Sequence, residues 1–174
     1  MTAPTQRLLE LLDPILARFA ALAPDTRRDA AEVAAVEAAL EHAFPYAGEH
    51  VQAIGRELER GIAEGWLCDR GDATARFSRV AKAGPATHEL SIDVVSMDGD
   101  AIEHTHPSGE LTLGFASDPG ASRAGQADSC QFEGRAPGWV FLPPDSRHVP
   151  RVTGGRMHLD YFLPRGAVVW HPPA

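Results

Sequence analysis

The amino-acid sequence predicts an α+β protein, mainly β, in which a helical N-terminal segment precedes a small β-barrel or sandwich. Apolar residues recur at three- and four-residue steps through the first third of the chain, the period of a helix that packs on one face. Beyond residue 65, short alternating segments are separated by turn residues. With 174 residues, 44% of them hydrophobic, one domain can form a sizeable core. We therefore expect a helical segment at residues 1–65 and a β-barrel domain at residues 66–174.

Three amphipathic stripes indicate three helices. The first stripe runs from Leu8 to Leu22 and contains Pro14, so this helix either kinks or restarts with Asp13 as its N-cap. The second stripe lies at residues 33–44, and the third lies at residues 51–62. Asp29 and Glu32 have the spacing of a capping box before the second helix, and Gly65 is suited to end the third.

Strand-like segments follow, with turn residues between them. In the segment ELTLGFA, the large apolar residues alternate with smaller ones, as in a half-buried strand. The polar, Gly-rich stretch at residues 116–138 predicts a long loop or lid. The expected strands are 66–69 and 75–80, paired as a hairpin, and then 88–97, 110–116, 138–144 and 156–164.

Charge and composition exclude several classes of protein. A net charge of −8 argues against nucleic acid as the main partner, because phosphate binding needs a concentrated positive field. The sequence has no apolar run long enough to span a membrane and no secretory signal, so a cytoplasmic protein without a membrane partner is expected. Cys68 and Cys130 are far apart in the sequence and are expected to be free thiols.

The segment HTHPSGE suggests a metal site. His104 and His106 point to the same face of a strand, and Glu110 follows after a turn, so the three side chains can converge. His148, in a Pro-rich turn after another strand, supplies a further ligand. Imidazole and carboxylate ligands suit Zn, Fe, Mn, Ni or Cu, and we expect one such divalent ion here. The alternatives are a metal-free barrel that uses these residues for acid–base work, or a chance arrangement.

These residues resemble the two motifs of the cupin superfamily, which implies a small β-barrel of the double-stranded β-helix type. The first motif is matched by Gly99, His104, His106 and Glu110, and the second by Gly138, Pro143 and His148. Asp145 stands where the second motif usually has glycine, and Val152 stands where it usually has asparagine. In cupins the matching histidines and glutamate bind a divalent metal.

A closer resemblance, to the bacterial 4-hydroxylaminobenzoate lyase family, spans nearly the whole chain. It is carried by the segments AEGWLCDRG, RFSRVAK, THELSIDVV, HTHPSGE, PGWVFLPPDSRHVPRVTGGRM and YFLPRGAV. Thr112 departs from the family pattern, which has an acidic residue there, and segment 116–137 is longer than in that pattern. The resemblance implies a lyase of nitroaromatic degradation that converts 4-hydroxylaminobenzoate and water to 3,4-dihydroxybenzoate (protocatechuate) and ammonia, without NAD or flavin.

Such a reaction assigns roles to particular residues. Glu110 would be a metal ligand, or a base if it leaves the metal, and Tyr161 would assist proton transfer. Arg79, Arg147 and Arg151 are the candidates for binding the carboxylate of a small aromatic substrate.

Two other functions remain open from the sequence. The same four ligands would serve a cupin dioxygenase or isomerase acting on another aromatic or sugar acid. A ligand sensor is also conceivable, but the helical stripe at residues 30–44 has no Arg or Lys with which to contact nucleic acid. The helices are instead expected to pack on the barrel or across a homodimer.

Overall fold

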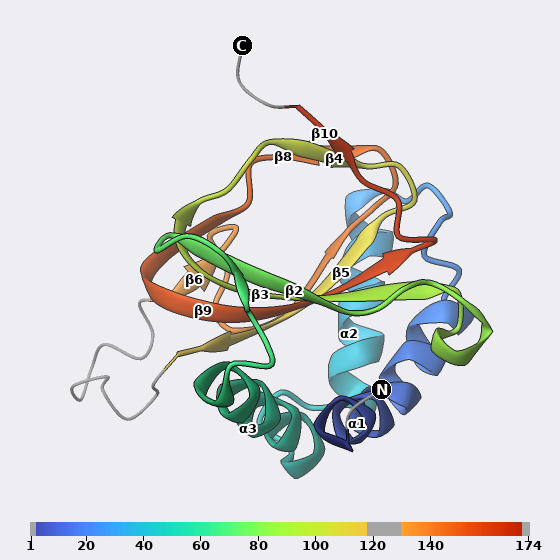
Figure 1. Ribbon diagram of the computed structural model, residues 1–174. Helices are drawn as coiled ribbons and strands as arrows, with labels where there is room; N and C mark the ends of the chain where they lie inside the picture. Colours follow the sequence, from blue (N-terminus) through green and yellow to red (C-terminus); the bar gives the residue numbers. More distant parts are fainter. Residues whose placement is uncertain (1–2, 118–129, 172–174) are drawn as a thin grey trace.

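The computed structural model describes residues 3–117 and 130–171, which form three α-helices followed by antiparallel strands (Figure 1). The helices are α1 (Ala3–Ala21), α2 (Ala30–Ala43) and α3 (Glu49–Glu64), and a short 3-10 turn, η1, spans Pro85–Thr87. The strands are β1 (Arg70–Gly71), β2 (Ala75–Ala81), β3 (Leu90–Asp100), β4 (His104–His106), β5 (Glu110–Ala116), β6 (Gln131–Phe132), β7 (Gly138–Leu142), β8 (Ser146–His148), β9 (Arg151–Pro164) and β10 (Val169–Trp170).

The helices begin and end where their capping residues allow. Helix α1 continues through Pro14 without a restart, so the alternative with a new N-cap at Asp13 is wrong. The capping box of α2 is confirmed: Asp29 and Glu32 exchange two side-chain to backbone hydrogen bonds of 2.9 Å. Helix α3 ends at Gly65, whose φ of +77° suits glycine.

The β-structure is the cupin-type fold expected from the sequence, built from two antiparallel sheets. In the larger sheet the order is β1-β2-β3-β9-β5-β7, with β6 beside β9. In the smaller sheet the order is β10-β4-β8. Figure 1 shows the helices on one side of the larger sheet and the smaller sheet on the other. Among the described residues the two sheets remain separate, so hydrogen bonds do not close them into a continuous barrel.

Alternation along the strands separates two faces of the larger sheet. On β5, Leu111, Leu113 and Phe115 belong to the core that the sheet shares with the helices. Helix α3 approaches the sheet closely at Gly55, where an added Cβ would lie 2.8 Å from the ring of Phe115. The intervening residues of β5, Glu110 among them, therefore lie on the face toward the smaller sheet. We call this face the interior face. The helices and the larger sheet share one hydrophobic core. The expected division into a helical segment, residues 1–65, and a barrel domain, residues 66–174, therefore stays a prediction.

Two sequence-based expectations need correction or restriction. Residues 66–69 were expected to form a strand, but they bend, and the hairpin contains only β1 and β2. Backbone N–H groups of Trp66 and Leu67 instead close the end of α3 on Gly61, and Cys68 has a φ of +52°. Of the loop or lid expected at 116–138, residues 118–129 lie outside the described part, and β6 occupies part of the remainder.

The other elements follow the expected order. Cys68 and Cys130 are free thiols, as predicted, and both are buried. No helix among the described residues is both long and apolar enough to cross a membrane.

Candidate metal centre

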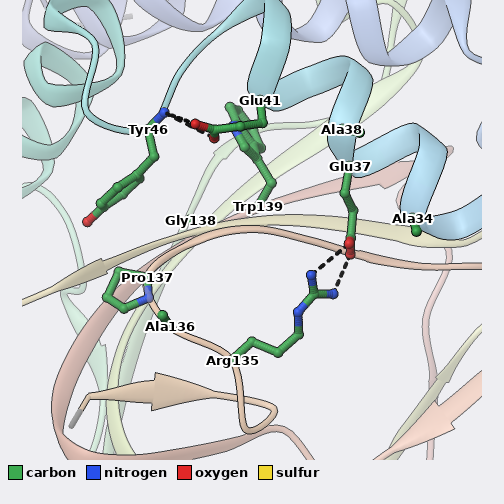
Figure 2. A pocket seen from close by; sticks show the side chains of 10 residues that line it. All are labelled: Ala34, Glu37, Ala38, Glu41, Tyr46, Arg135, Ala136, Pro137, Gly138 and Trp139. Atoms are coloured by element: carbon green, nitrogen blue, oxygen red, sulfur yellow. Dashed lines mark hydrogen bonds and ion pairs between the residues drawn. The ribbon is translucent and has the colours of Figure 1, made fainter. Parts of the chain in front are cut away.

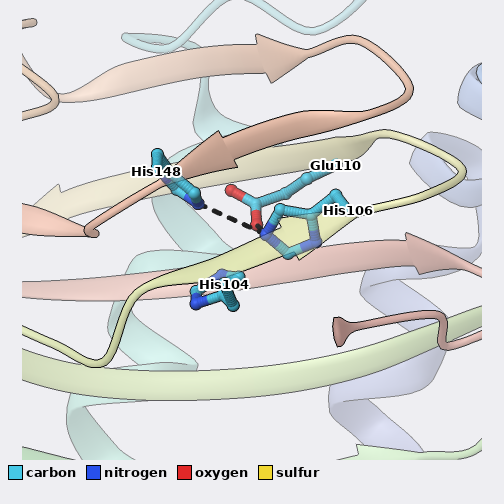
Figure 3. A group of neighbouring side chains, drawn as sticks. All are labelled: His104, His106, Glu110 and His148. Carbon is cyan, nitrogen blue, oxygen red and sulfur yellow. Dashed lines mark hydrogen bonds and ion pairs between the residues drawn. The ribbon is translucent and has the colours of Figure 1, made fainter. Parts of the chain in front are cut away.

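Both sheets contribute to a cluster of four side chains, and these are the four predicted metal ligands (Figure 3). Strand β4 pairs with β8 so that His104 lies opposite His148, and His106 projects to the same face two residues on. A turn then leads into β5, where Glu110 begins the larger sheet. One potential ligand atom from each residue lies within 4.8 Å of all the others. The spacing of the motif thus brings the four residues together as expected.

Two turns hold these strands in place. Gly109 has a φ of +83°, and an added Cβ would lie 3.0 Å from the carbonyl oxygen of Pro24 and 3.1 Å from that of Leu142. In the turn before β8, Asp145 has a φ of +66° and its N–H donates to the carbonyl of His106 at 2.9 Å. A glycine is usual at this motif position because of that backbone conformation, which aspartate tolerates better than most residues.

The side-chain contacts leave the potential metal-binding atoms of the cluster facing one another. Nδ1 of His104 lies 2.8 Å from the carbonyl of Ile102, which favours the tautomer with a free Nε2. Nε2 of His106 lies 3.3 Å from Nε2 of His148 and 2.5 Å from Oε2 of Glu110. Converging nitrogen lone pairs and a carboxylate oxygen form the kind of donor set that binds a transition metal.

Burial strengthens this interpretation. His106 and Glu110 are almost fully buried, and Oε2 of Glu110 lacks a well-formed hydrogen bond among the described residues. Buried polar groups are costly unless they are satisfied, and a metal ion would satisfy this carboxylate oxygen. The residues present therefore fit a divalent metal ion.

The electrostatics keep two of these side chains in the forms that bind metal. Burial lowers the pKa of His104, and the neighbouring His106 and His148 lower it further, against the raising effect of the Ile102 carbonyl. Burial raises the pKa of Glu110, but contacts with His106, the charges of His106 and His148, and the Thr112 hydrogen bond leave it below its ordinary value. A neutral imidazole and an ionised carboxylate are the metal-binding forms.

A row of polar residues extends from the cluster across the interior face. Strand pairing places Thr112 beside Tyr161, Tyr161 beside Asp93, and Asp93 beside Arg79. Tyr161 is 7% exposed, and its ring packs edge-on against Phe132. Arg79 donates two hydrogen bonds, of 2.8 and 3.1 Å, to Asp93. Of the predicted substrate-binding arginines, Arg79 is therefore on the same face as Glu110.

The structure does not bring the other two predicted arginines to the cluster. Arg147 pairs with Thr105, so it projects to the opposite face of the smaller sheet from His104 and His148. Its guanidinium donates to Glu103 at 2.8 and 3.1 Å. Arg151 donates to Asp100 at 2.7 and 2.9 Å at the start of β9. Each forms an exposed ion pair on its own sheet.

Sequence reasoning assigned no role in the site to three residues that contact the candidate ligands or Arg79. Thr112 donates a 2.7 Å hydrogen bond to Oε1 of Glu110. Asp93 holds Arg79, and Oε2 of Glu133 lies 3.6 Å from Nδ1 of His148. Only Thr112 carried a signal in the sequence, because it stands two residues after Glu110 and shares its face.

A depression elsewhere lies between α2 and β7 and does not include any of the predicted site residues (Figure 2). Its polar lining is already paired: Arg135 contacts both carboxylate oxygens of Glu37, at 2.5 and 2.6 Å. The backbone N–H of Tyr46 donates to Glu41 at 3.1 Å. The charged side chains that line this depression, Glu37, Glu41 and Arg135, therefore already have partners in the structure.

Comparison with known proteins agrees with the resemblance noted in the sequence. The family model described as 4-hydroxylaminobenzoate lyase matches residues 20–170. A 4-hydroxylaminobenzoate lyase of Pseudomonas putida is 31% identical over 134 residues, which is 69% of this chain and 73% of the relative. One from Nocardioides sp. (strain LMS-CY) is 27% identical over 143 residues, which is 78% of this chain and 82% of the relative.

Solved structures with a related arrangement are more distant. An RmlC-like cupin protein from Ralstonia eutropha has a TM-score of 0.41 and 12% identity, with 59% of this chain and 66% of that chain covered. The DMSP lyase DddQ from Ruegeria pomeroyi has a TM-score of 0.42 and 20% identity, with 98% of this chain and 92% of that chain covered. The family relationship is therefore carried by the sequence matches.

Proposed function

Because the chain belongs to the 4-hydroxylaminobenzoate lyase family, and is thus an enzyme of the lyase class, we propose that its substrate is 4-hydroxylaminobenzoate itself. The products would be 3,4-dihydroxybenzoate and ammonia, with one water consumed, in nitroaromatic degradation. The observation that supports this proposal most directly is the cluster of His104, His106, Glu110 and His148, in which Glu110 lies on the interior face that also presents Tyr161. The substrate would bind between the two sheets.

The four cluster residues would hold a divalent transition metal. Such an ion supplies Lewis acidity toward the hydroxylamino oxygen and lowers the pKa of a water from about 16 toward 7. His104, held through Nδ1 by the Ile102 carbonyl, presents Nε2. Glu110, held through Oε1 by Thr112, presents Oε2. These hydrogen bonds fix the ligands before substrate arrives.

Tyr161 would donate a proton in this reaction. Burial raises the pKa of its hydroxyl well above the usual value of 10.0, and the negative charges of Glu110 and Glu133 raise it further. The proton therefore stays on the Tyr161 oxygen at neutral pH. A neutral hydroxyl can donate to the leaving nitrogen or oxygen as the N–O bond breaks.

Arg79 would bind the substrate carboxylate. Asp93 accepts from its Nε and from one Nη2 hydrogen, so the far end of the guanidinium remains available. The guanidinium is partly exposed, with 44% of the side chain accessible. A carboxylate can bind that end through charge-assisted hydrogen bonds. Asp93 would keep the guanidinium oriented.

The proposal is tested by turnover and metal content measured on the same samples. Wild-type protein purified without chelator should contain about one equivalent of a transition metal and release ammonia and 3,4-dihydroxybenzoate from 4-hydroxylaminobenzoate. His106→Ala should lose the metal and at least about 100-fold of the activity, since it removes a ligand. Full activity in metal-depleted protein would rule out the Lewis-acid role.

Two further measurements test the reaction against that of a dioxygenase and the role of Arg79 in substrate binding. Turnover should continue without O₂, whereas a cupin dioxygenase would stop. Arg79→Gln should raise KM by about 10-fold or more through the lost charge-assisted hydrogen bonds. Arg151→Gln, a matched change at an exposed arginine on the same sheet, should leave KM unchanged. Equal KM values in the two variants would remove Arg79 from the substrate site.

A further inference from the structure

We propose that Thr112 is a positioning residue that makes Glu110 offer a single carboxylate oxygen, Oε2, to the metal. The inference deepens the proposed metal centre and rests on it. Oγ1 of Thr112 donates to Oε1 of Glu110 at 2.7 Å. Both side chains are fully buried, with 0% of each residue exposed. Water therefore does not compete for this hydrogen bond.

The two oxygens of Glu110 have different surroundings. Oε1 has a hydrogen-bond donor, the Thr112 hydroxyl. Oε2 has no well-formed hydrogen bond among the described residues and lies 2.5 Å from Nε2 of His106, within the ligand cluster. A carboxylate with one oxygen held in this way binds through the other, whereas an unheld carboxylate can also bind through both. Thr112 thereby fixes which atom becomes the ligand.

The position of the hydroxyl is set by the sheet. Thr112 lies in the middle of β5, opposite Val140 of β7 on one side and Tyr161 of β9 on the other. Its β-branched side chain has few rotamers in a strand. Residues i and i+2 share a face, so the hydroxyl is directed along the strand toward Glu110. In the described part of the chain, Glu110 is the hydroxyl's one hydrogen-bond partner.

The test compares the metal affinity of Thr112→Val, which keeps the shape but removes the donor, with that of Thr112→Ser, which keeps the donor. Cobalt(II) is the probe, because competition against a chromophoric chelator gives the Kd and visible absorption reports the coordination. Thr112→Val should bind cobalt(II) about 10- to 100-fold more weakly than wild type, with a changed absorption spectrum. Thr112→Ser should bind within about 3-fold of wild type.

The outcomes separate this inference from the proposed function. Equal cobalt(II) affinity and spectra in wild type and Thr112→Val would overturn the role of Thr112 alone. Failure of wild type to bind cobalt(II) would overturn the metal centre, and the inference with it. Thermal unfolding of the metal-free proteins identifies a variant that does not fold. If Thr112→Val does not fold, the cobalt(II) affinities of Thr112→Ala and Thr112→Ser are compared instead. Equal affinities in these two variants would again contradict the positioning role of Thr112.

Discussion

At the scale of single residues, β9 shows how alternation assigns neighbours to opposite environments. Tyr161 lies on the interior face, whereas Asp160 pairs with Val94 and Leu113, which face the helices. Asp160 is 0% exposed, and both of its carboxylate oxygens lack a hydrogen-bond partner among the described residues. Burial, with the negative charge of Asp93 as the smaller cause, raises the pKa of Asp160 to about 8. Its carboxyl is therefore mostly neutral in the folded protein at neutral pH.

The raised pKa of Asp160 predicts a pH-dependent loss of stability. The carboxyl ionises near pH 4 in the unfolded chain and near pH 8 in the folded chain. Its stabilising contribution is therefore complete below about pH 4 and declines as pH rises toward about 8. Asp160→Asn cannot titrate, so its free energy of unfolding relative to wild type should rise by more than about 1 kcal/mol between about pH 5 and about pH 8. Urea unfolding at several pH values measures this difference.

His158 also makes the stability of wild type depend on pH, and the comparison with Asp160→Asn removes this contribution. Burial, aided by the charge of Arg156, lowers the pKa of His158 to about 4, so its contribution to stability is lost as pH falls. Wild type and Asp160→Asn share His158, and the difference between them isolates Asp160. A difference that stays constant across the pH range would mean that Asp160 is ionised in the folded protein.

The sequence could predict the convergence of the cluster because strand periodicity places His104 and His106 on one face. It could not predict the contacts around the cluster. The approach of Glu133 to His148 depends on a φ of +53° at Glu133, and the Arg79–Asp93 pair depends on the register between β2 and β3. Arg147, which is adjacent to His148 in the sequence, points to the other face of its strand.

At the scale of secondary-structure elements, helix α2 protects an edge of the larger sheet. Strand β7 is the last strand in the order, so one of its sides is not covered by a neighbouring strand. Glu37 of α2 reaches that side, and its Oε1 accepts from the backbone N–H of Phe141 at 2.9 Å. The carboxylate is 13% exposed and also pairs with Arg135. Glu37 thus supplies a hydrogen-bond acceptor that a neighbouring strand would otherwise provide at this edge.

We therefore expect Glu37→Ala to destabilise the protein by about 1–3 kcal/mol, because a partly buried N–H loses its acceptor. Glu37→Gln retains an acceptor oxygen and should cost less than about 1 kcal/mol. Urea unfolding gives both values, and hydrogen exchange at the Phe141 amide should speed up in Glu37→Ala only. Equal losses in the two variants would assign the effect to the ion pair with Arg135.

The elements themselves were predictable to different degrees. The start of helix α2 was predicted well because Asp29 and Glu32 have the spacing of a capping box. The short strands β8 and β10 were not predicted, because two or three residues carry too little alternation. Residues 66–69 have strand-like composition, but closing the end of α3 determines their conformation. Tertiary contacts override local preference there.

At the scale of the whole molecule, the candidate metal centre joins the two sheets. Three of the predicted ligands, His104, His106 and His148, lie on the smaller sheet, and Glu110 lies on the larger one. The smaller sheet is built from strands of two or three residues, so strand pairing gives it little stability of its own. The expected homodimer and cytoplasmic location stay predictions.

A metal bound by both sheets should stabilise the folded chain as a whole. Because an ion at 100 times its Kd contributes about 2.7 kcal/mol, metal removal should lower Tm by about 5–10 °C for a chain of this size. Thermal unfolding with and without a chelator measures the shift, and His106→Ala, which lacks a ligand, should not respond. Hydrogen exchange in metal-free protein should accelerate first in β4 and β8, because they contribute three of the four ligands. Exchange that accelerates equally in β3 and β9 would show instead that the metal stabilises the chain globally and not the smaller sheet selectively.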